Sequence, residues 1–182
     1  MLPKSYSLEV AGLTRELPLC KAAPGLYIAA FIMFSDVELT VACAAELLKK
    51  CPAHEVIITA ESKGIPVAYE MARQSGKPYI VARKSVKLYM QDPIGVPVKS
   101  ITTEGGQSLY LSAEDAKCLK GKRVLVVDDV ISTGESLKGL QKLISAAGGE
   151  IVGTAAVLAE GDAVSRTDIT FLEELPLFFT EE

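Results

Sequence analysis

The segment 123–160 constrains the fold more than any other part of this sequence. It begins with RVLVVDD, a continuous apolar run of the kind found in strands that are covered on both faces. Residues 135–147 then repeat leucine and isoleucine at helical spacing, Gly148 and Gly149 end that helix, and residues 151–160 form a second apolar run. A strand, a helix and a strand in this order predict a βαβ unit in a parallel sheet.

The preceding part of the chain repeats this alternation. Strands are expected at 27–33, 55–60 and 78–83, and helices at 36–50 and 65–74. Between 84 and 111 the sequence is polar, carries two prolines and contains Gly105-Gly106, which predicts a β-hairpin flap. The fold class is therefore α/β, with a parallel sheet flanked by helices and a flap. Residues 162–182 show no clear period, and their structure is left open.

Length and composition exclude several classes of protein. The chain has 182 residues, of which 49% are hydrophobic and 23% charged, as expected for a single globular domain, 1–182. The net charge of -4 provides no positive field for nucleic acid, and the four cysteines form no CxxC pair that would suggest zinc. MLPKSYSLEV lacks the features of a signal peptide, and no apolar run is long enough to span a membrane. We therefore expect a cytoplasmic protein without a nucleic-acid or membrane partner.

The residues around the two aspartates predict a phosphate site beside a site for hydroxyl groups. The helix after the strand opens with Ser132, Thr133, Gly134, Glu135 and Ser136. Backbone N–H groups, hydroxyls and the helix dipole at such a turn bind phosphate, although the GxxxxGK[ST] order of a P-loop is absent. Asp128 and Asp129 would repel phosphate, so we expect them to accept hydrogen bonds from vicinal hydroxyls or to hold a divalent cation through water. A ribose 5-phosphate with bound Mg²⁺ meets both requirements.

Residues 124–136, VLVVDDVISTGES, resemble at every position the phosphoribosyl pyrophosphate (PRPP) signature of the type I phosphoribosyltransferases. ESKGIPVAYEMA (61–72) is similar to the pyrophosphate loop of the adenine and xanthine enzymes, and it is closest to the PRPP-binding domain of the Gram-positive purine repressor. KPYIVARKSVK (77–87) is similar to the strand that leads into their catalytic loop. The resemblance implies one domain with a small hood, formed by residues 1–36 and the C-terminal tail, and a flexible flap at 84–111. It also implies a homodimer.

The resemblance also implies a role for each site residue. Pyrophosphate would be bound by Glu61, Ser62, Lys63 and Gly64, with a cis bond between Ser62 and Lys63. The ribose hydroxyls would be bound by Asp128 and Asp129, which would also hold Mg²⁺ through water, and the 5-phosphate by residues 132–136. The candidate catalytic residues are the cations that offset the charge of PRPP, namely Lys63, Arg83, Lys84 and Lys87. Ribosyl transfer through an oxocarbenium-like transition state needs positioning, charge neutralisation and exclusion of water rather than a protein nucleophile.

The base is the least constrained part of the ligand. FIMFSDVEL (31–39) resembles the hood of the xanthine enzymes in its Asp-x-Glu-Leu end, but Met33-Phe34 replaces their Asn-His pair. The candidate base-binding residues are Phe34, which could stack on a purine or pack in the core, and Glu160, which could contact the base or lie exposed at a strand end. Adenine is the favoured base.

Two functions follow from the resemblance. The first is a purine phosphoribosyltransferase that makes a nucleotide from PRPP and a free base. The second is a PRPP-sensing regulatory protein without catalytic activity, suggested by the similarity of ESKGIPVAY to the repressor domain. About 26 residues precede the first expected core strand and the pI is near 5.2, so we expect no DNA-binding module. The basic residues at 83–87 favour the enzyme, because PRPP binding alone does not require a catalytic loop.

Overall fold

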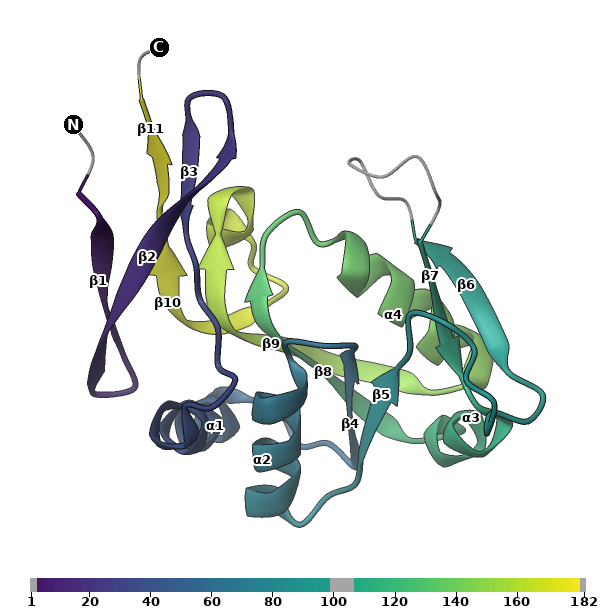
Figure 1. Ribbon diagram of the computed structural model, residues 1–182. Coiled ribbons are helices and arrows are strands. Elements are labelled where there is room, and N and C mark those ends of the chain that lie inside the picture. The colour runs from purple at the N-terminus through teal and green to yellow at the C-terminus, as the bar shows by residue number, and fades with distance from the viewer. Residues whose placement is uncertain (1–2, 99–106, 181–182) are drawn as a thin grey trace.

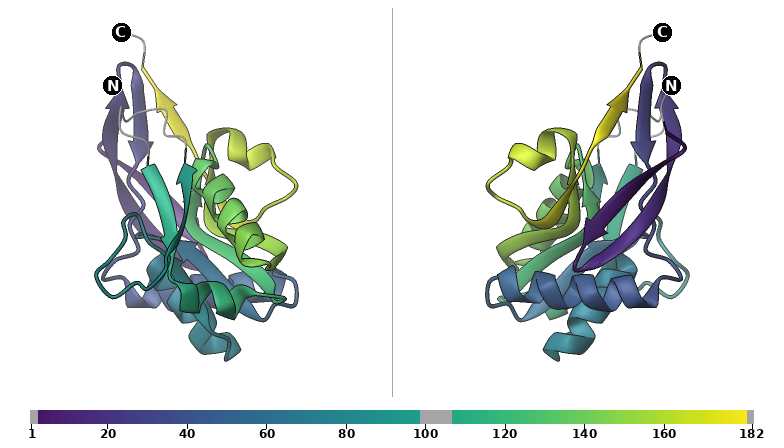
Figure 2. Two further views of the ribbon diagram at one scale, coloured as in Figure 1. Left: turned by 90° about the vertical axis from the view of Figure 1, so that its right-hand side faces the viewer. Right: turned by 90° about the vertical axis from the view of Figure 1, so that its left-hand side faces the viewer.

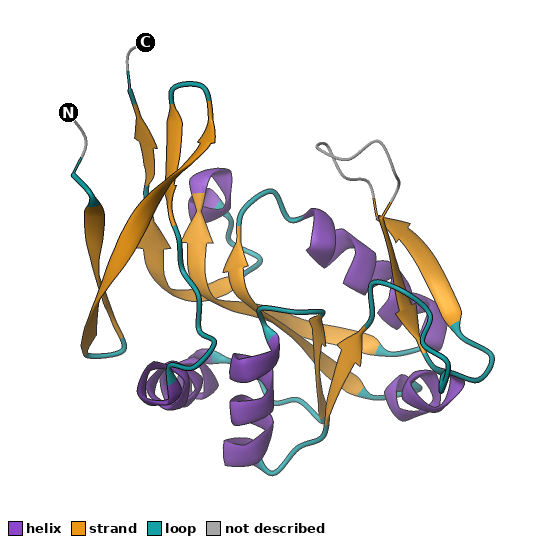
Figure 3. Ribbon diagram, viewed as in Figure 1, coloured by secondary structure: helices purple, strands orange, loops and turns teal. Residues whose placement is uncertain are grey.

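The computed structural model describes residues 3–98 and 107–180 and confirms the α/β architecture (Figures 1 and 3). The strands are β1 (Ser5–Val10), β2 (Leu13–Ala23), β3 (Leu26–Ala29), β4 (Val56–Ala60), β5 (Tyr79–Ala82), β6 (Ile94–Val98), β7 (Gln107–Leu111), β8 (Arg123–Ile131), β9 (Glu150–Glu160), β10 (Thr170–Leu175) and β11 (Leu177–Phe179). The helices are α1 (Val37–Lys50), α2 (Ile65–Ser75), α3 (Ala113–Leu119), α4 (Glu135–Ala147) and the short 3₁₀ helix η1 (Gly161–Ser165). Within these described ranges, no helix combines the length and the apolar sequence needed to cross a bilayer.

The central sheet has five parallel strands in the order β10-β9-β8-β4-β5. Helix α2 connects β4 to β5 on one face of this sheet, whereas α4 lies on the other face, between β8 and β9 in the chain. From β4 the chain moves along the sheet in one direction, and from β8 it moves in the opposite direction. The loops after β4 and β8 therefore lie next to each other where the direction of strand addition reverses. Open parallel sheets bind ligands at this position.

Apolar side chains cover both faces of the central sheet. Ile57 and Leu125 face α1 and α2, whereas the residues that follow them, Ile58 and Val126, face α4. All four side chains are at most 2% exposed. Burial on both faces explains why β4 and β8 are continuous apolar runs and not alternating sequences.

Helix α4 has the bounds that the sequence predicts. Gly134 and Gly148 flank it with φ values of 73° and 76°, a left-handed conformation that glycine adopts without strain. Gly139, in its middle, allows the hairpin to pack closely, because a Cβ at this position would lie 2.5 Å from Cγ2 of Val98. Glycines therefore define both ends of α4, and the middle of the helix packs against the flap hairpin.

The flap is confirmed as an antiparallel hairpin of β6 and β7. Val98 and Leu109 are 8% and 3% exposed and belong to the core under α4, so this part of the flap is packed against the domain. The backbones of Arg83 and Tyr110 exchange two hydrogen bonds of 2.9 and 2.8 Å, which join the end of β5 to the hairpin. The predicted turn at Gly105-Gly106 lies outside the described residues.

The segment 27–33, predicted as a core strand, does not join the central sheet, and its first residues belong to a separate hood sheet. Only Leu26–Ala29 is extended, as β3, and it pairs antiparallel with β2 and β11. The hood has the order β1-β2-β3-β11, so it is built from the N-terminal strands and from Leu177–Phe179 (Figure 2). The prediction failed because an apolar run indicates burial but does not specify which sheet the segment joins. Phe31 and Met33 are buried outside any strand.

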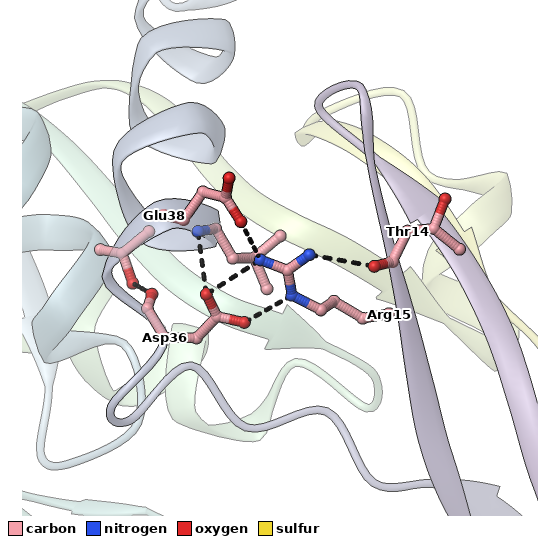
Figure 4. Close-up of polar contacts among 6 residues, drawn as sticks. Thr14, Arg15, Asp36 and Glu38 are labelled. Atoms are coloured by element: carbon pink, nitrogen blue, oxygen red, sulfur yellow. Dashed lines mark hydrogen bonds and ion pairs between the residues drawn. The ribbon is translucent and has the colours of Figure 1, made fainter.

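An ion-pair cluster fastens the hood to α1 (Figure 4). Arg15 of β2 donates to the Asp36 carboxylate from Nε at 2.7 Å and from Nη2 at 3.2 Å, and its Nη2 also donates to Glu38 at 2.7 Å. The same Asp36 carboxylate accepts the N–H of Leu39 at 3.0 Å, so the residue that caps α1 also holds the hood. Hydrogen bonding to Arg15 lowers the pKa of Asp36 below its usual range.

Candidate functional site

Four parallel strands carry the predicted site residues to one edge of the central sheet. Strand β4 leads into Glu61, β5 leads into Arg83, β8 contains Asp128 and Asp129, and β9 ends at Glu160. The carboxyl ends of parallel strands lie at the same edge, so side chains that are distant in the sequence come together there. Two adjoining cavities open at this edge.

The first cavity lies between the loop after β4 and the end of β8 and has a volume of about 210 Å³. It is lined by Ala60, Glu61, Ser62, Lys63, Lys84, Asp128, Asp129 and Ser136. All but Ala60 are residues that the sequence predicts for the site. The cis peptide bond of this loop lies between Glu61 and Ser62, one residue earlier than the predicted bond between Ser62 and Lys63.

The second cavity, of about 90 Å³, is formed by the end of β8 and the start of α4. It is lined by Val126, Asp128, Val130, Ile131, Ser132, Thr133, Gly134, Glu135, Ser136, Leu137 and Leu140. The two cavities share Asp128 and Ser136, so the predicted phosphate loop directly adjoins the predicted pyrophosphate loop. The first N–H groups of a helix have no partner within the helix and are available to an anion.

Asp128 and Asp129 lie side by side at the first cavity, where Asp128 is partly buried and Asp129 is buried, and Asp128 also lines the second cavity. Asp128 Oδ1 accepts the backbone N–H of Asp129 at 2.9 Å, and the Asp129 side chain is only 5% exposed. Burial, reinforced by the neighbouring Asp129 carboxylate, raises the pKa of Asp128 well above its usual value, and Lys63 opposes this shift only in part. The pair is an unfavourable arrangement in the free protein, which a ligand that supplies hydrogen-bond donors or a cation would relieve.

The Asp128–Asp129 pair fits a water-bridged Mg²⁺ better than a metal held by the protein alone. Asp129 Oδ2 is buried and has no hydrogen-bond partner among the described residues, so it is free to accept from a hydroxyl or a metal-bound water. In the described part of the chain, no group of three or more His, Cys, Asp or Glu side chains could hold a metal ion. Oxygens of the ligand would therefore have to complete the coordination.

Gly64 brings the loop after β4 into direct contact with Asp128. A Cβ at position 64 would lie 2.4 Å from Oγ1 of Thr59 and 2.7 Å from Oδ1 of Asp128. Its φ of -71° and ψ of -10° are ordinary helical values, so the surrounding space, and not the backbone conformation, requires glycine here. The packing of Gly64 fixes the distance between the two predicted loops.

Glu61 organises the basic segment that follows β5. Its carboxylate accepts the N–H of Lys84 at 2.9 Å and lies 3.8 Å from Nη1 of Arg83 and 4.0 Å from Nζ of Lys87. The hydrogen bond from Lys84 and these cations lower the pKa of Glu61. Arg83 also donates to the hydroxyl of Tyr89 at 2.8 Å. Glu61 thus contacts three of the four candidate catalytic residues, and Lys63 and Lys84 both line the first cavity.

The two candidate base-binding residues lie in different places. Glu160 is half-buried at the end of β9, where burial raises its pKa and Lys63 opposes that shift. Phe34 lines neither cavity described above, and instead lines a third, of about 240 Å³, between the start of α1 and helix α2. The structure therefore brings Glu160 within electrostatic reach of Lys63, although Glu160 lines neither of the first two cavities, and it leaves Phe34 apart from both cavities.

Arg166, which the sequence does not single out, also reaches the phosphate loop. A Cβ on Gly134 would lie 2.7 Å from its Nη1. Arg166 follows η1 in a segment without a recognisable motif, and only the three-dimensional fold shows that this segment returns to the loop after β8.

Comparison with known proteins agrees with this geometry. Residues 38–175 match the family model described as the phosphoribosyl transferase domain. The chain is 38% identical over 110 residues to a hypoxanthine/guanine phosphoribosyltransferase of Methanococcus voltae, covering 60% of this chain and 55% of that protein. It is 36% identical to a xanthine phosphoribosyltransferase of Exiguobacterium sp., covering 60% of this chain and 56% of that protein. The matches thus span just over half the length of these two relatives.

Adenine phosphoribosyltransferases are similar in both sequence and fold. The protein of Rhodococcus opacus is 34% identical over 126 residues, which cover 69% of each chain. The crystal structure of the Thermoanaerobacter pseudethanolicus protein aligns with a TM-score of 0.64 over 76% of this chain and 80% of that chain, at 21% identity. The Giardia lamblia structure aligns with a TM-score of 0.64 over 93% of both chains, at 16% identity. At these identities the solved structures establish the fold.

Proposed function

Since the chain belongs to the type I phosphoribosyltransferase family, we propose that it transfers the phosphoribosyl group of PRPP to a free purine base and releases pyrophosphate. The observation that carries this proposal is the pair of adjoining cavities with Asp128 and Asp129 between them. One cavity suits a pyrophosphate, the other suits a 5-phosphate, and the aspartates suit the hydroxyls of the ribose that links the two. A phosphorylated ribose that also carries pyrophosphate requires all three features in this order.

The protein contributes binding, orientation and charge. We assign the pyrophosphate to Ser62, Lys63 and Lys84, and Glu61 orients the basic segment without itself contacting the anion. The 5-phosphate lies at the N–H groups of the α4 terminus, so the ribose is held at both ends while its hydroxyls bond to the aspartates. Mg²⁺, when bound with PRPP, neutralises charge on the departing pyrophosphate. Fixing both ends of the sugar positions the reacting carbon without a protein nucleophile.

Adenine is the base that we assign, on the chemistry of Glu160. An ionised carboxylate only accepts hydrogen bonds, which suits the exocyclic amine of adenine and not the 6-oxygen of hypoxanthine, guanine or xanthine. This assignment requires the ionised form of Glu160, which burial disfavours and Lys63 favours. The adenine phosphoribosyltransferase of Rhodococcus opacus also matches over a larger share of its own length than the hypoxanthine/guanine and xanthine relatives do.

A panel of free bases tests the reaction and the base together. With PRPP and Mg²⁺, adenine should yield nucleotide and pyrophosphate, whereas guanine, hypoxanthine, xanthine, uracil and orotate should not. The double variant Asp128→Asn/Asp129→Asn should lose about 10²- to 10⁴-fold in kcat/KM, because hydrogen bonds to charged groups contribute about 1.5–3 kcal/mol each. Glu160→Gln adds a donor and should reduce the preference for adenine. Turnover of a 6-oxopurine but not of adenine would overturn the base assignment.

A PRPP sensor is the second candidate function, and the same panel separates it from the enzyme. The similarity of residues 61–69 to a repressor domain is the observation that favours it. Tight PRPP binding without turnover of any base would support the sensor. The cations gathered by Glu61 beside the first cavity favour the enzyme.

We also propose that the protein is a homodimer that associates through an exposed apolar face over α1 and α2. This face consists of Ile32, Phe34, Val37, Val41 and Tyr69, which are 39–73% exposed; all of them except Ile32 line the third cavity. Exposed apolar clusters of this kind commonly mark interfaces. Light scattering should give twice the chain mass of 19.4 kDa. The double variant Val37→Glu/Tyr69→Glu should give the monomer mass. The control variant Phe179→Glu, at an equally exposed site on the hood, should remain dimeric. A monomeric wild-type protein would refute the proposal.

A further inference from the structure

Among the described residues, 3–98 and 107–180, no basic side chain lines the cavity at the start of α4, although a 5-phosphate carries up to two negative charges. Its eleven lining residues include two carboxylates, Asp128 and Glu135, and no lysine or arginine. The carboxylate of Glu135 pairs with Lys138 on the outer side of the helix, at 2.7 Å. Backbone N–H groups and hydroxyls alone would therefore have to bind the dianion beside a carboxylate. A positively charged side chain from another segment would offset the negative charges of the phosphate and of these carboxylates.

Arg166 is a positively charged residue that lies beside the phosphate loop, next to Gly134. Its Nη1 lies so close to Gly134 that a Cβ on this glycine would be 2.7 Å away. The backbone N–H of Arg166 donates to the carbonyl of Ala163 at 3.1 Å, which anchors the residue to the end of η1. The side chain is 28% exposed, so it lies mostly against the protein and does not extend into solvent.

Asp168 holds the guanidinium in one orientation. Arg166 donates from Nε to Oδ1 of Asp168 at 2.9 Å and from Nη2 to Oδ2 at 2.7 Å. This two-bond pairing fixes the plane of the guanidinium and leaves Nη1 on the side of Gly134. The Asp168 carboxylate, which is 63% exposed, lies on the Nε and Nη2 side of the guanidinium, whereas Nη1 lies on the side of the phosphate loop.

We propose that Arg166 binds the 5-phosphate of the ligand, donating from Nη1 across Gly134. This inference deepens the proposed function and rests on it. It also explains the glycine at position 134 by a second cause besides its positive φ, because any side chain there would displace Nη1 from the loop.

Two fragments of PRPP test phosphate binding by Arg166 separately from ligand binding in the rest of the site. Ribose 5-phosphate occupies only the second cavity, and Mg²⁺-pyrophosphate occupies only the first. In titration calorimetry on the full chain, Arg166→Gln should bind ribose 5-phosphate about 10- to 100-fold more weakly and bind Mg²⁺-pyrophosphate within about twofold of wild type, as expected for the loss of one charged hydrogen bond. Arg166→Lys should recover part of the loss. In steady-state assays the KM for PRPP should rise while kcat changes little.

Arg73 offers a matched control. It pairs with Glu70 in the same two-bond geometry, at 2.8 and 2.7 Å, but on α2 and outside both cavities. Arg73→Gln should leave both affinities unchanged. Equal binding of ribose 5-phosphate by wild type and Arg166→Gln would overturn the inference, as would a parallel loss of both ligands with a lowered melting temperature, which would indicate only a structural role. Failure of wild type to bind either ligand would instead refute the proposed function.

Discussion

Asp128→Asn should stabilise the ligand-free protein while it removes most of its activity. Burial and the adjacent Asp129 raise the pKa of Asp128 in the folded state, so above the unfolded pKa of about 3.9 the folded protein holds this proton more tightly than the unfolded chain does. The free energy of unfolding therefore falls as pH rises from about 4 through the folded pKa. Asparagine removes this dependence. The stability gain of the variant should grow with pH, and kcat/KM should fall about 10- to 100-fold.

Urea unfolding at pH 5 and pH 8, without PRPP or Mg²⁺, measures this effect. The difference between variant and wild type isolates Asp128, because the carboxylates with lowered pKa, such as Asp36 and Glu61, contribute equally to both proteins. Glu150→Gln, an exposed site at the opposite end of β9, removes the same charge and should show no such pH dependence. A variant that is less stable than wild type at pH 8 would show that Asp128 stabilises the free fold.

Gly64→Ala should reduce kcat/KM by about 100-fold or more. The added Cβ would lie 2.4 Å from Thr59 Oγ1 and 2.7 Å from Asp128 Oδ1, so the loop after β4 must move away from the aspartates. A displacement of about 1 Å in a site that works by positioning is enough for a loss of this size. Overpacking should also lower the free energy of unfolding by about 1–3 kcal/mol.

Gly76, at the other end of α2, is the matched control for this variant. It has a φ of 67°, and an added Cβ would have no other atom within 4 Å, so alanine would meet backbone strain but no steric clash. Gly76→Ala should lower stability by about 1–2 kcal/mol and leave kcat/KM unchanged. Addition of Thr59→Ala to Gly64→Ala should recover part of the activity, because it removes the closest clash. Wild-type activity in Gly64→Ala would mean that the two loops do not need this contact.

The sequence predicts those parts of the fold that have local signals. Glycines on either side of α4 determine its ends, and the buried strands β4 and β8 are recognisable from their apolar runs. Helix α3 was not predicted, although Ser112 caps it by accepting the N–H of Asp115 at 3.1 Å, because seven residues are too few to show a period. The assignment of 27–33 to the core sheet was wrong because the partners of β3 are determined by the tertiary fold.

The residues of the candidate site also differ in whether a local sequence signal predicts them. Glu61, Lys63, Lys84 and Asp128 were predicted from motifs at strand ends, and the topology of a parallel sheet brings them to one cavity. Arg166 follows no motif and reaches Gly134 only through the path of η1 and the segment after it. The position of Phe34 was equally unpredictable, because the exposed loop that carries it has no periodic pattern.

The hood combines strands from both ends of the sequence, and this determines when it can form during synthesis. Ile28 of β3 pairs with Leu177 of β11, although all five strands of the parallel sheet lie between them in the sequence. At a translation rate of about 5–20 residues per second, roughly 7–30 s pass between the synthesis of these two residues. During that interval β3 presents an unpaired strand edge, which can pair with another chain. Because β10 ends only two residues before β11 begins, the last strand of the central sheet and the last strand of the hood are both added at the end of synthesis.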